Sequence, residues 1–270
     1  MTKHHPTVVS NPWHSLRKFT PGRIALGRTG ISLPTAQQLA FQLDHARARD
    51  AVHQHLDIDA IKKSVNDLKW VERCLVVESA ADNRGIYLQR PDLGRRLSVR
   101  SKLLLQSQAE SSRDASYDLI FVIADGLSAS AIEASAAAFL QAMHQYITKH
   151  PLRCGPVVIA QQGRVAIGDE IGELMAAKVV VVMIGERPGL SSPDSMGLYM
   201  TWEPRVGLTD ERRNCISNIR PAGLSFEEAA CKLDYLVSEA LRRCVSGVQL
   251  KDETAAASLE GRLSNFLLGD

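Results

Sequence analysis

The chain has 270 residues, of which 45% are hydrophobic and 23% are charged, as is usual for a folded globular protein. This composition excludes a disordered chain, a collagen-like chain and a disulfide scaffold, and the length allows one large domain or two smaller ones. The formal net charge of +2 and the aromatic content of 5% do not support a nucleic-acid partner.

The N-terminus and the cysteines show no sign of export or of a metal cluster. Residues Met1 to Ser10 are polar and lack the apolar core of a secretory signal, and no apolar run approaches the ~18 residues that a membrane span needs. The five cysteines are odd in number and form no Cys-x-x-Cys arrangement, which disfavours a zinc cluster or a disulfide framework. We therefore expect a protein of the reducing cytoplasm, with no membrane as partner.

The first third of the chain is predicted to be mainly helical. Pro34 to Leu56 begins with proline and carries apolar residues near helical spacing, and Ile58 to Trp70 predicts a second, shorter helix. A short strand is expected over Leu75 to Glu78. Asp82 to Gly85 then indicates a turn, so that Ile86 to Leu88 would form the second strand of a hairpin.

The most basic part of the chain runs from Arg84 to Lys102, where six cations accompany one acid, Asp92. It fits either a solvated face or a site for a phosphate or an acidic partner, because guanidinium groups pair with both.

Apolar runs alternate with helical segments from Tyr117 onward. Strands are expected over Asp118 to Ala124, Pro156 to Ala160, Lys178 to Ile184 and Leu198 to Trp202. Helices are expected over Ser128 to His150, Asp169 to Lys178, and Ser225 to Ser246, the last with a capping box at its start and Gly247 as its stop. This alternation predicts an α/β fold with a mostly parallel sheet, apolar on both faces.

Candidate ligand contacts follow the strands, because ligands in open α/β sheets bind beyond the carboxyl ends of the strands. The segments that follow the first three runs are Asp125 to Ser128, Gln161 to Val165, and Gly185 to Gly189. All three contain glycine, which either turns the chain or lets a ligand approach the backbone closely. A large polar ligand that is rich in amides and carries one phosphate would find donors, acceptors and cations here.

Motifs for a self-sufficient enzyme are missing. There is no Gly-x-Gly-x-x-Gly after a strand, no P-loop, no His-Glu-x-x-His and no Gly-x-Ser-x-Gly. All eight histidines lie between His4 and His150, so none follows the last strands. Asp125, Asp169 and Glu186 are the carboxylates placed for acid–base work, but nothing pairs them with a nucleophile. The pattern therefore favours a binding module over a complete enzyme, with no catalytic and no metal-ligating residue.

The chain resembles the small (light) subunit of ethanolamine ammonia-lyase from about Asn11 to Leu250. Segments 185–190 (Gly-Glu-Arg-Pro-Gly-Leu) and 215–218 (Cys-Ile-Ser-Asn) form a highly specific pair. The other matching segments are 88–96, 125–128, 163–165, 169–173 and 182–184.

This resemblance implies a lyase that converts ethanolamine to acetaldehyde and ammonia by a radical mechanism with adenosylcobalamin. It implies a heteromer in which a large TIM-barrel subunit holds the substrate, while a Rossmann-like sheet in this chain covers the cobalamin. Three cobalamin contacts carry over, namely Val165, Glu186 and Cys215. The Asp-x-His-x-x-Gly motif that replaces the base on cobalt is absent, as in that family.

The expected organisation follows from the pattern and the resemblance together. Residues 1–110 would form a mainly helical region with partner contacts, residues 111–250 the Rossmann-like domain, and residues 251–270 a tail that is either a loose end or a docking helix. Some family members carry a long N-terminal extension that directs them into a bacterial microcompartment. This chain begins shortly before the shared region, so we expect it in the cytoplasm, either free or encapsulated through its partner. The alternatives are a Rossmann-type nucleotide-binding enzyme and a non-catalytic scaffold protein.

Overall fold

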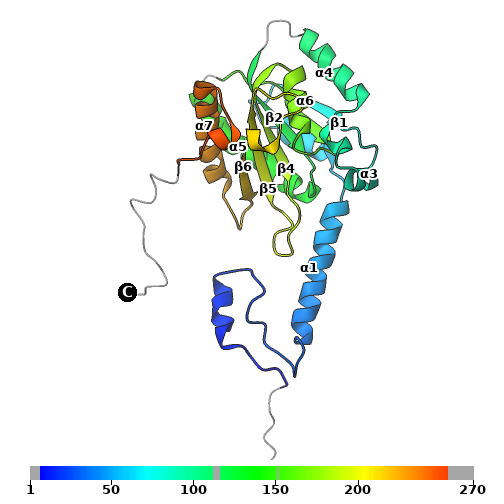
Figure 1. Ribbon diagram of the computed structural model, residues 1–270, viewed down its shortest axis with the longest axis vertical. Coiled ribbons are helices and arrows are strands. Elements are labelled where there is room, and N and C mark those ends of the chain that lie inside the picture. Colours follow the sequence, from blue (N-terminus) through cyan, green and yellow to red (C-terminus); the bar gives the residue numbers. More distant parts are fainter. Residues whose placement is uncertain (1–6, 112–115, 151, 255–270) are drawn as a thin grey trace, which may run out of the picture.

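A six-stranded sheet with the strand order β1-β3-β2-β4-β5-β6 lies at the centre of the computed structural model, which describes residues 7–111, 116–150 and 152–254 (Figure 1). The strands are β1 (Cys74–Glu78), β2 (Tyr117–Ala124), β3 (Val157–Gln161), β4 (Ala177–Gly185), β5 (Met196–Trp202) and β6 (Arg213–Ile219). The first four are mutually parallel, whereas β5 runs antiparallel to both β4 and β6. The predicted mostly parallel sheet of an α/β protein is thus confirmed.

Helices cover both faces of the sheet. Helices α2 (Ile58–Asn66), α5 (Ala129–Lys149) and α7 (Phe226–Arg243) pack on one face, and α4 (Val99–Ser111) and α6 (Ile167–Leu174) pack on the other. Strand β2 shows why its sequence is apolar throughout: Phe121 faces the first layer and Val122 faces the second, and both are fully buried. Burial of each such side chain stabilises the fold by about 1.5–3 kcal/mol before entropic costs.

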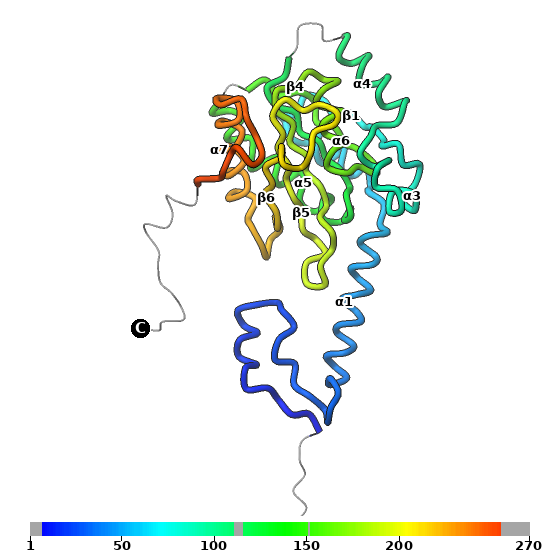
Figure 2. Tube along the Cα trace, viewed as in Figure 1, coloured from blue at the N-terminus to red at the C-terminus, as the bar shows by residue number. Residues whose placement is uncertain are grey.

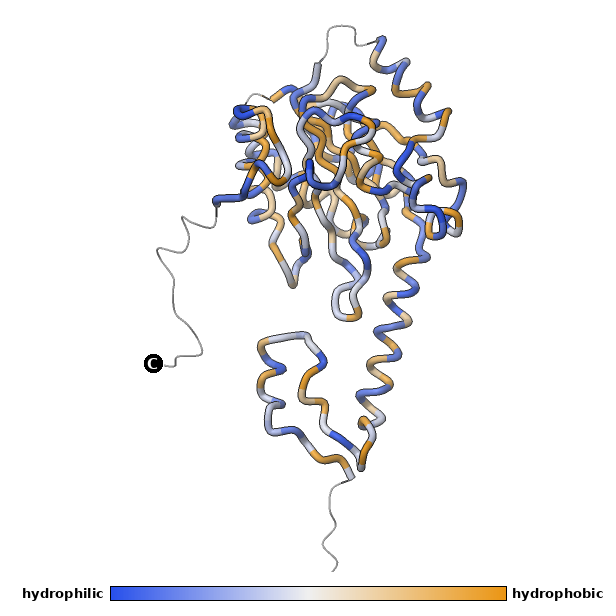
Figure 3. The backbone as a smooth tube through the Cα atoms, viewed as in Figure 1, coloured by the Kyte–Doolittle hydropathy of each residue, from blue (hydrophilic) through white to orange (hydrophobic). Residues whose placement is uncertain are grey.

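Residues 7–53 extend away from the sheet and are hereafter called the arm (Figures 1 and 2). It contains a short 3-10 helix (Pro12–Lys18) and helix α1 (Thr35–His53), which buries only Ala51. Figure 3 shows hydrophobic residues at intervals along this arm, and several of their large side chains are exposed. They include Val8, Trp13, Phe19, Ile31, Leu33, Leu39 and Leu43. Clustered exposed apolar side chains of this kind are typical of a surface that contacts another molecule.

Three sequence predictions need correction. Residues 86–88 do not form a strand, because Asn83 accepts a hydrogen bond from the amide of Ile86 (3.0 Å) and caps helix α3 (Arg84–Gln89). Strand β6 was not predicted. Helix α7 begins at the predicted capping box but ends at Arg243, before the predicted stop at Gly247, and Cys244 caps it in the left-handed conformation.

Two further predictions concern the C-terminal tail and membrane spans. The tail prediction for residues 251–270 lies outside the described residues from position 255 onward. Within residues 7–111, 116–150 and 152–254, no helix is both long and apolar enough to cross a membrane.

Candidate functional site

The three segments that follow β2, β3 and β4 meet at one edge of the sheet. These strands are neighbours and run parallel, so their carboxyl ends lie side by side. A cavity of about 410 Å³, hereafter the strand-end cavity, opens there. Its walls include Tyr87, Gly126, Arg164, Val165, Glu186, Arg187 and Tyr199. The structure therefore brings together the segments that the sequence singled out.

Two glycines allow the ends of β2 and β4 to touch. Gly126 has φ +57°, and a Cβ built on it would lie 2.3 Å from the carbonyl oxygen of Gly185. A Cβ on Gly185 would lie 2.0 Å from the carbonyl oxygen of Ser128. No larger residue fits either position without moving backbone. These two glycines are needed for the close contact between the two loops. Their presence is therefore explained by packing and does not by itself indicate a ligand.

Glu186 lies at the end of β4, and neighbouring strands fix its carboxylate. Oε2 accepts a hydrogen bond from the hydroxyl of Ser195 and another, of 3.3 Å, from the backbone amide of Asn218. A Cβ on Gly197 would lie 2.9 Å from Oε1, so glycine makes the space that the carboxylate occupies. Glu186 lines the strand-end cavity, and no residue that the structure describes donates a hydrogen bond to Oε1. This oxygen therefore keeps a free acceptor position.

Val165 and Cys215 lie around the same cavity. Val165 is half-buried in its wall, in the segment after β3. Cys215, on β6, pairs directly with Tyr199 of β5, and Tyr199 lines the cavity. Burial raises the pKa of Tyr199, and the adjacent Cys215 thiol adds to the rise. The Cys215 side chain is exposed and lies next to this residue of the cavity wall.

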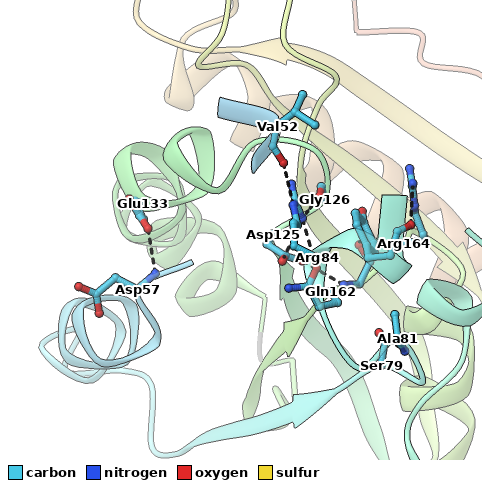
Figure 4. A network of polar contacts seen from close by, with 12 residues as sticks. Val52, Asp57, Ser79, Ala81, Arg84, Asp125, Gly126, Glu133, Gln162 and Arg164 are labelled. Carbon is cyan, nitrogen blue, oxygen red and sulfur yellow. Dashed lines mark hydrogen bonds and ion pairs between the residues drawn. The ribbon is translucent and has the colours of Figure 1, made fainter. Parts of the chain in front are cut away.

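Arg84 and Asp125 form a buried ion pair next to the residues of the cavity wall (Figure 4). Arg84 Nη1 lies 3.3 Å from Asp125 Oδ2, and the two side chains are 5% and 2% exposed. Burial raises the pKa of Asp125, and the charge of Arg84 opposes this rise. Arg84 also donates to the carbonyl oxygens of Val52 and Gly126, while Asp125 accepts from the amide of Gly163 (3.0 Å). The pair thus joins the end of α1 to the ends of β2 and β3.

The rest of the basic stretch does not form one surface. Arg96 and Lys102 both pair with Glu170 on α6, at 3.1 and 2.8 Å. Burial alone would raise the pKa of Glu170, but hydrogen bonds from Lys102, the amide of Leu97 and Arg96 outweigh it and lower this pKa. Arg95 and Arg100 are exposed. The stretch therefore combines internal ion pairs with a few solvated cations.

Asp169 does not line the strand-end cavity, although its position after a strand made it a candidate. It forms an ion pair with Arg213, and the two side chains are 4% and 2% exposed. Burial raises the pKa of Asp169 to about 6, against the opposing charge of Arg213. Its role in this structure is therefore to neutralise Arg213. The described part of the chain contains no group of three or more His, Cys, Asp or Glu side chains that could hold a metal ion.

The fold and the site define an α/β protein with a cavity at the carboxyl ends of its parallel strands, the usual ligand position in such sheets. Residues 10–251 match the family described as ethanolamine ammonia-lyase light chain (EutC). The chain is 53% identical to the ethanolamine ammonia-lyase small subunit of Pseudomonas aeruginosa strain UCBPP-PA14, over 98% of each chain. It is 52% identical to that of Pseudomonas fluorescens strain Pf0-1, over 97% of each chain. The chain belongs to the ethanolamine ammonia-lyase light-chain family.

Proposed function

We propose that this chain is the small subunit of an adenosylcobalamin-dependent ethanolamine ammonia-lyase, which converts ethanolamine to acetaldehyde and ammonia. In this proposal the chain covers the cobalamin, and a large TIM-barrel subunit holds ethanolamine. One observation supports the proposal beyond family membership: Val165 and Glu186 line the strand-end cavity, and Cys215 pairs with Tyr199 of its wall, although the three lie apart in the sequence.

The residues around the cavity fit one side of a cobalamin. The cavity, at about 410 Å³, is within the usual size of a small-ligand site but much too small to enclose a whole cobalamin. A corrin would therefore rest on the open edge, with its other face against the partner. Val165 offers an apolar contact, and Oε1 of Glu186 offers an acceptor for a corrin amide.

The described residues of the cavity wall include no carboxylate paired with a second group for acid–base work. Glu186 is the carboxylate in its wall, and Ser195 and Asn218 already hold that group. When bound, adenosylcobalamin supplies the radical that starts the reaction. The proposed work of this chain is to bind the cofactor, orient it and exclude water from one side.

The exposed arm supports the proposed heteromer. Trp13 is 64% exposed and Ile31 is 106% exposed, and neither side chain belongs to the core of the residues that the structure describes. Apolar surface of this extent is typical of protein–protein contacts. We assign the partner contacts to residues 1–110 and the cobalamin cover to residues 111–250, although β1 joins the sheet from the first of these ranges. We place the assembly in the cytoplasm, either free or inside a bacterial microcompartment.

Reconstitution tests the proposal. The chain alone should not turn over ethanolamine, whereas the chain co-purified with its large subunit should carry a cobalamin spectrum and release acetaldehyde. Turnover by the chain alone would contradict the division of labour. A co-purified complex that retains no cobalamin would contradict the proposed cofactor role and favour a scaffold. A nucleotide retained in place of cobalamin would favour the nucleotide-binding alternative.

A further inference from the structure

Two arginines line the strand-end cavity without a carboxylate partner. Arg164 directly precedes Val165, and Arg187 directly follows Glu186. Among the residues that the structure describes, neither arginine forms an ion pair. Arg84, which like Arg164 lies over the Tyr87 ring, does form one. The one carboxylate in the wall, Glu186, is held by a hydroxyl and an amide. The cavity therefore has an excess of positive charge.

The Arg164 side chain is held in place before any ligand arrives. Its guanidinium lies over the ring of Tyr87, 4.3 Å from the ring centroid. Tyr87 is fully buried, and its hydroxyl donates to the carbonyl oxygen of Gly163 (3.1 Å). The Nε atom of Arg164 is buried and has no hydrogen-bond partner in the described part of the chain. A cation fixed in this way loses little side-chain entropy when it binds an anion.

Gly94 provides the space for this arrangement. A Cβ at position 94 would lie 2.9 Å from both Cγ of Arg164 and Cε2 of Tyr87. The carbonyl oxygen of Gly94 also accepts a hydrogen bond of 2.7 Å from the amide of Arg164. Gly94 belongs to the basic stretch 84–102. This stretch therefore contributes to the cavity by leaving room for the Arg164 side chain.

We propose that Arg164 is a specificity residue that binds the phosphodiester of the cobalamin nucleotide, with Arg187 as a second, more mobile cation. This inference rests on the proposed cobalamin role. The side chains around a corrin end in neutral amides, so the phosphodiester is the peripheral group that a guanidinium distinguishes. A planar guanidinium offers paired N–H donors that match two phosphate oxygens. Glu186 and Arg164, after two strands that flank β2, would thus bind an amide and the phosphate of one ligand.

Three corrinoids separate this contact from the rest of the ligand. Adenosylcobalamin carries the phosphodiester, adenosylcobinamide phosphate carries phosphate without the nucleoside, and adenosylcobinamide carries neither. Dissociation constants would be measured by equilibrium dialysis with corrin absorbance, using the complex of this chain with its large subunit. Arg164→Gln should weaken binding of the two phosphorylated corrinoids by about ten- to a hundredfold, the scale of one charge-assisted hydrogen bond. Binding of adenosylcobinamide should change by less than about twofold on the same scale.

Other variants keep the test independent of folding. Arg187 is exposed, so Arg187→Gln should fold normally and give a smaller loss with the same dependence on phosphate. Gly94→Ala retains every charge but displaces the Arg164 stem, and should reproduce the loss of Arg164→Gln. Arg205 is exposed near the start of β4, at the opposite edge of the sheet, so Arg205→Gln should leave all three affinities unchanged.

The possible results distinguish this inference from the function on which it rests. Equal losses for adenosylcobinamide and adenosylcobinamide phosphate would overturn the phosphate contact and indicate that Arg164 meets the corrin or a carboxylate of the partner subunit. Unchanged affinity in both arginine variants would also overturn it. A wild-type complex that binds none of the three corrinoids would instead contradict the proposed cobalamin role.

Discussion

The backbone amide of Asn218 donates a hydrogen bond of 3.3 Å to Oε2 of Glu186, which joins the end of β6 to the end of β4. Ser195, just before β5, donates to the same oxygen. Three strand ends are thus connected through one carboxylate. Segments 185–190 and 215–218 form a highly specific motif pair in the sequence, and this hydrogen bond connects the two segments in the fold.

Replacement of Glu186 tests this arrangement. Glu186→Ala removes the acceptor that faces the ligand and leaves the Asn218 amide without its partner. We expect cobalamin retention in the complex to fall about tenfold, because one hydrogen bond to a charged group contributes about 1.5–3 kcal/mol. Spectrophotometric titration of the complex with hydroxocobalamin would measure the change. Glu110→Ala, on the exposed surface of α4, is the matched control, and equal affinity in the two variants would remove Glu186 from the site.

The Arg84–Asp125 pair predicts a large stability effect at some distance from the ligand. Asp125→Ala leaves the Arg84 guanidinium buried without a countercharge, which should lower the free energy of unfolding by about 3–5 kcal/mol. The double variant Arg84→Met/Asp125→Ala should recover part of that loss, since it removes both charges. Urea unfolding of the four proteins in this cycle measures both effects. Losses that simply add would contradict a coupled pair.

An exposed ion pair provides the control for that cycle. Arg90 Nη2 lies 2.7 Å from Asp92 Oδ2 on the surface, where water screens both charges. Arg90→Met should therefore leave the unfolding midpoint in urea unchanged. A shift as large as that of Asp125→Ala would show that charge loss alone, without burial, accounts for the effect.

The sequence predicted the apolar strands and the loops after them, but not the partners of the polar groups. Strand β4 was recognisable because it is buried on both faces and continuously apolar. Strand β6 was missed because one of its faces is open, so that Cys215 and its polar neighbours interrupt the apolar pattern. Helix α3 has six residues, too few to show a helical period. The partner of Arg84 lies 41 residues further along the chain, a distance over which no local pattern carries information.

Cysteine labelling should report on the site directly. Burial raises the pKa of Cys74 to about 11 and that of Cys154 to about 12. The thiolate is the reactive form, so at pH 8 roughly one thiol in 10³ to 10⁴ is ionised at these positions, and the labelling rate should rise about tenfold with each pH unit above that. Iodoacetamide at pH 8 should therefore modify the exposed Cys215, Cys231 and Cys244 first, as read by peptide mass spectrometry.

The same experiment on the complex distinguishes Cys215 from the other exposed cysteines. Addition of adenosylcobalamin should protect Cys215, whereas Cys231 and Cys244, in and just after α7, should react as fast as before. Guanidinium chloride should make all five cysteines reactive, which confirms that burial is the cause of protection at Cys74 and Cys154. Equal labelling of Cys215 with and without the cofactor would place it outside the cobalamin contact.

The exposed arm predicts where the chain meets its large subunit. Trp13 and Ile31 do not belong to the core that the structure describes, so Trp13→Ser/Ile31→Ser should leave the thermal unfolding of the free chain unchanged. The same double variant should weaken assembly by at least about thirtyfold if either side chain is a central contact, since such residues contribute about 2 kcal/mol or more. Size-exclusion chromatography at a series of concentrations would measure it. Val248 is also exposed, at 72%, but lies in the 3-10 helix after α7, so Val248→Ser serves as the matched control. If Val248→Ser weakens assembly as much as the arm variant does, loss of apolar surface in general is the cause, and the arm is not the partner-binding segment.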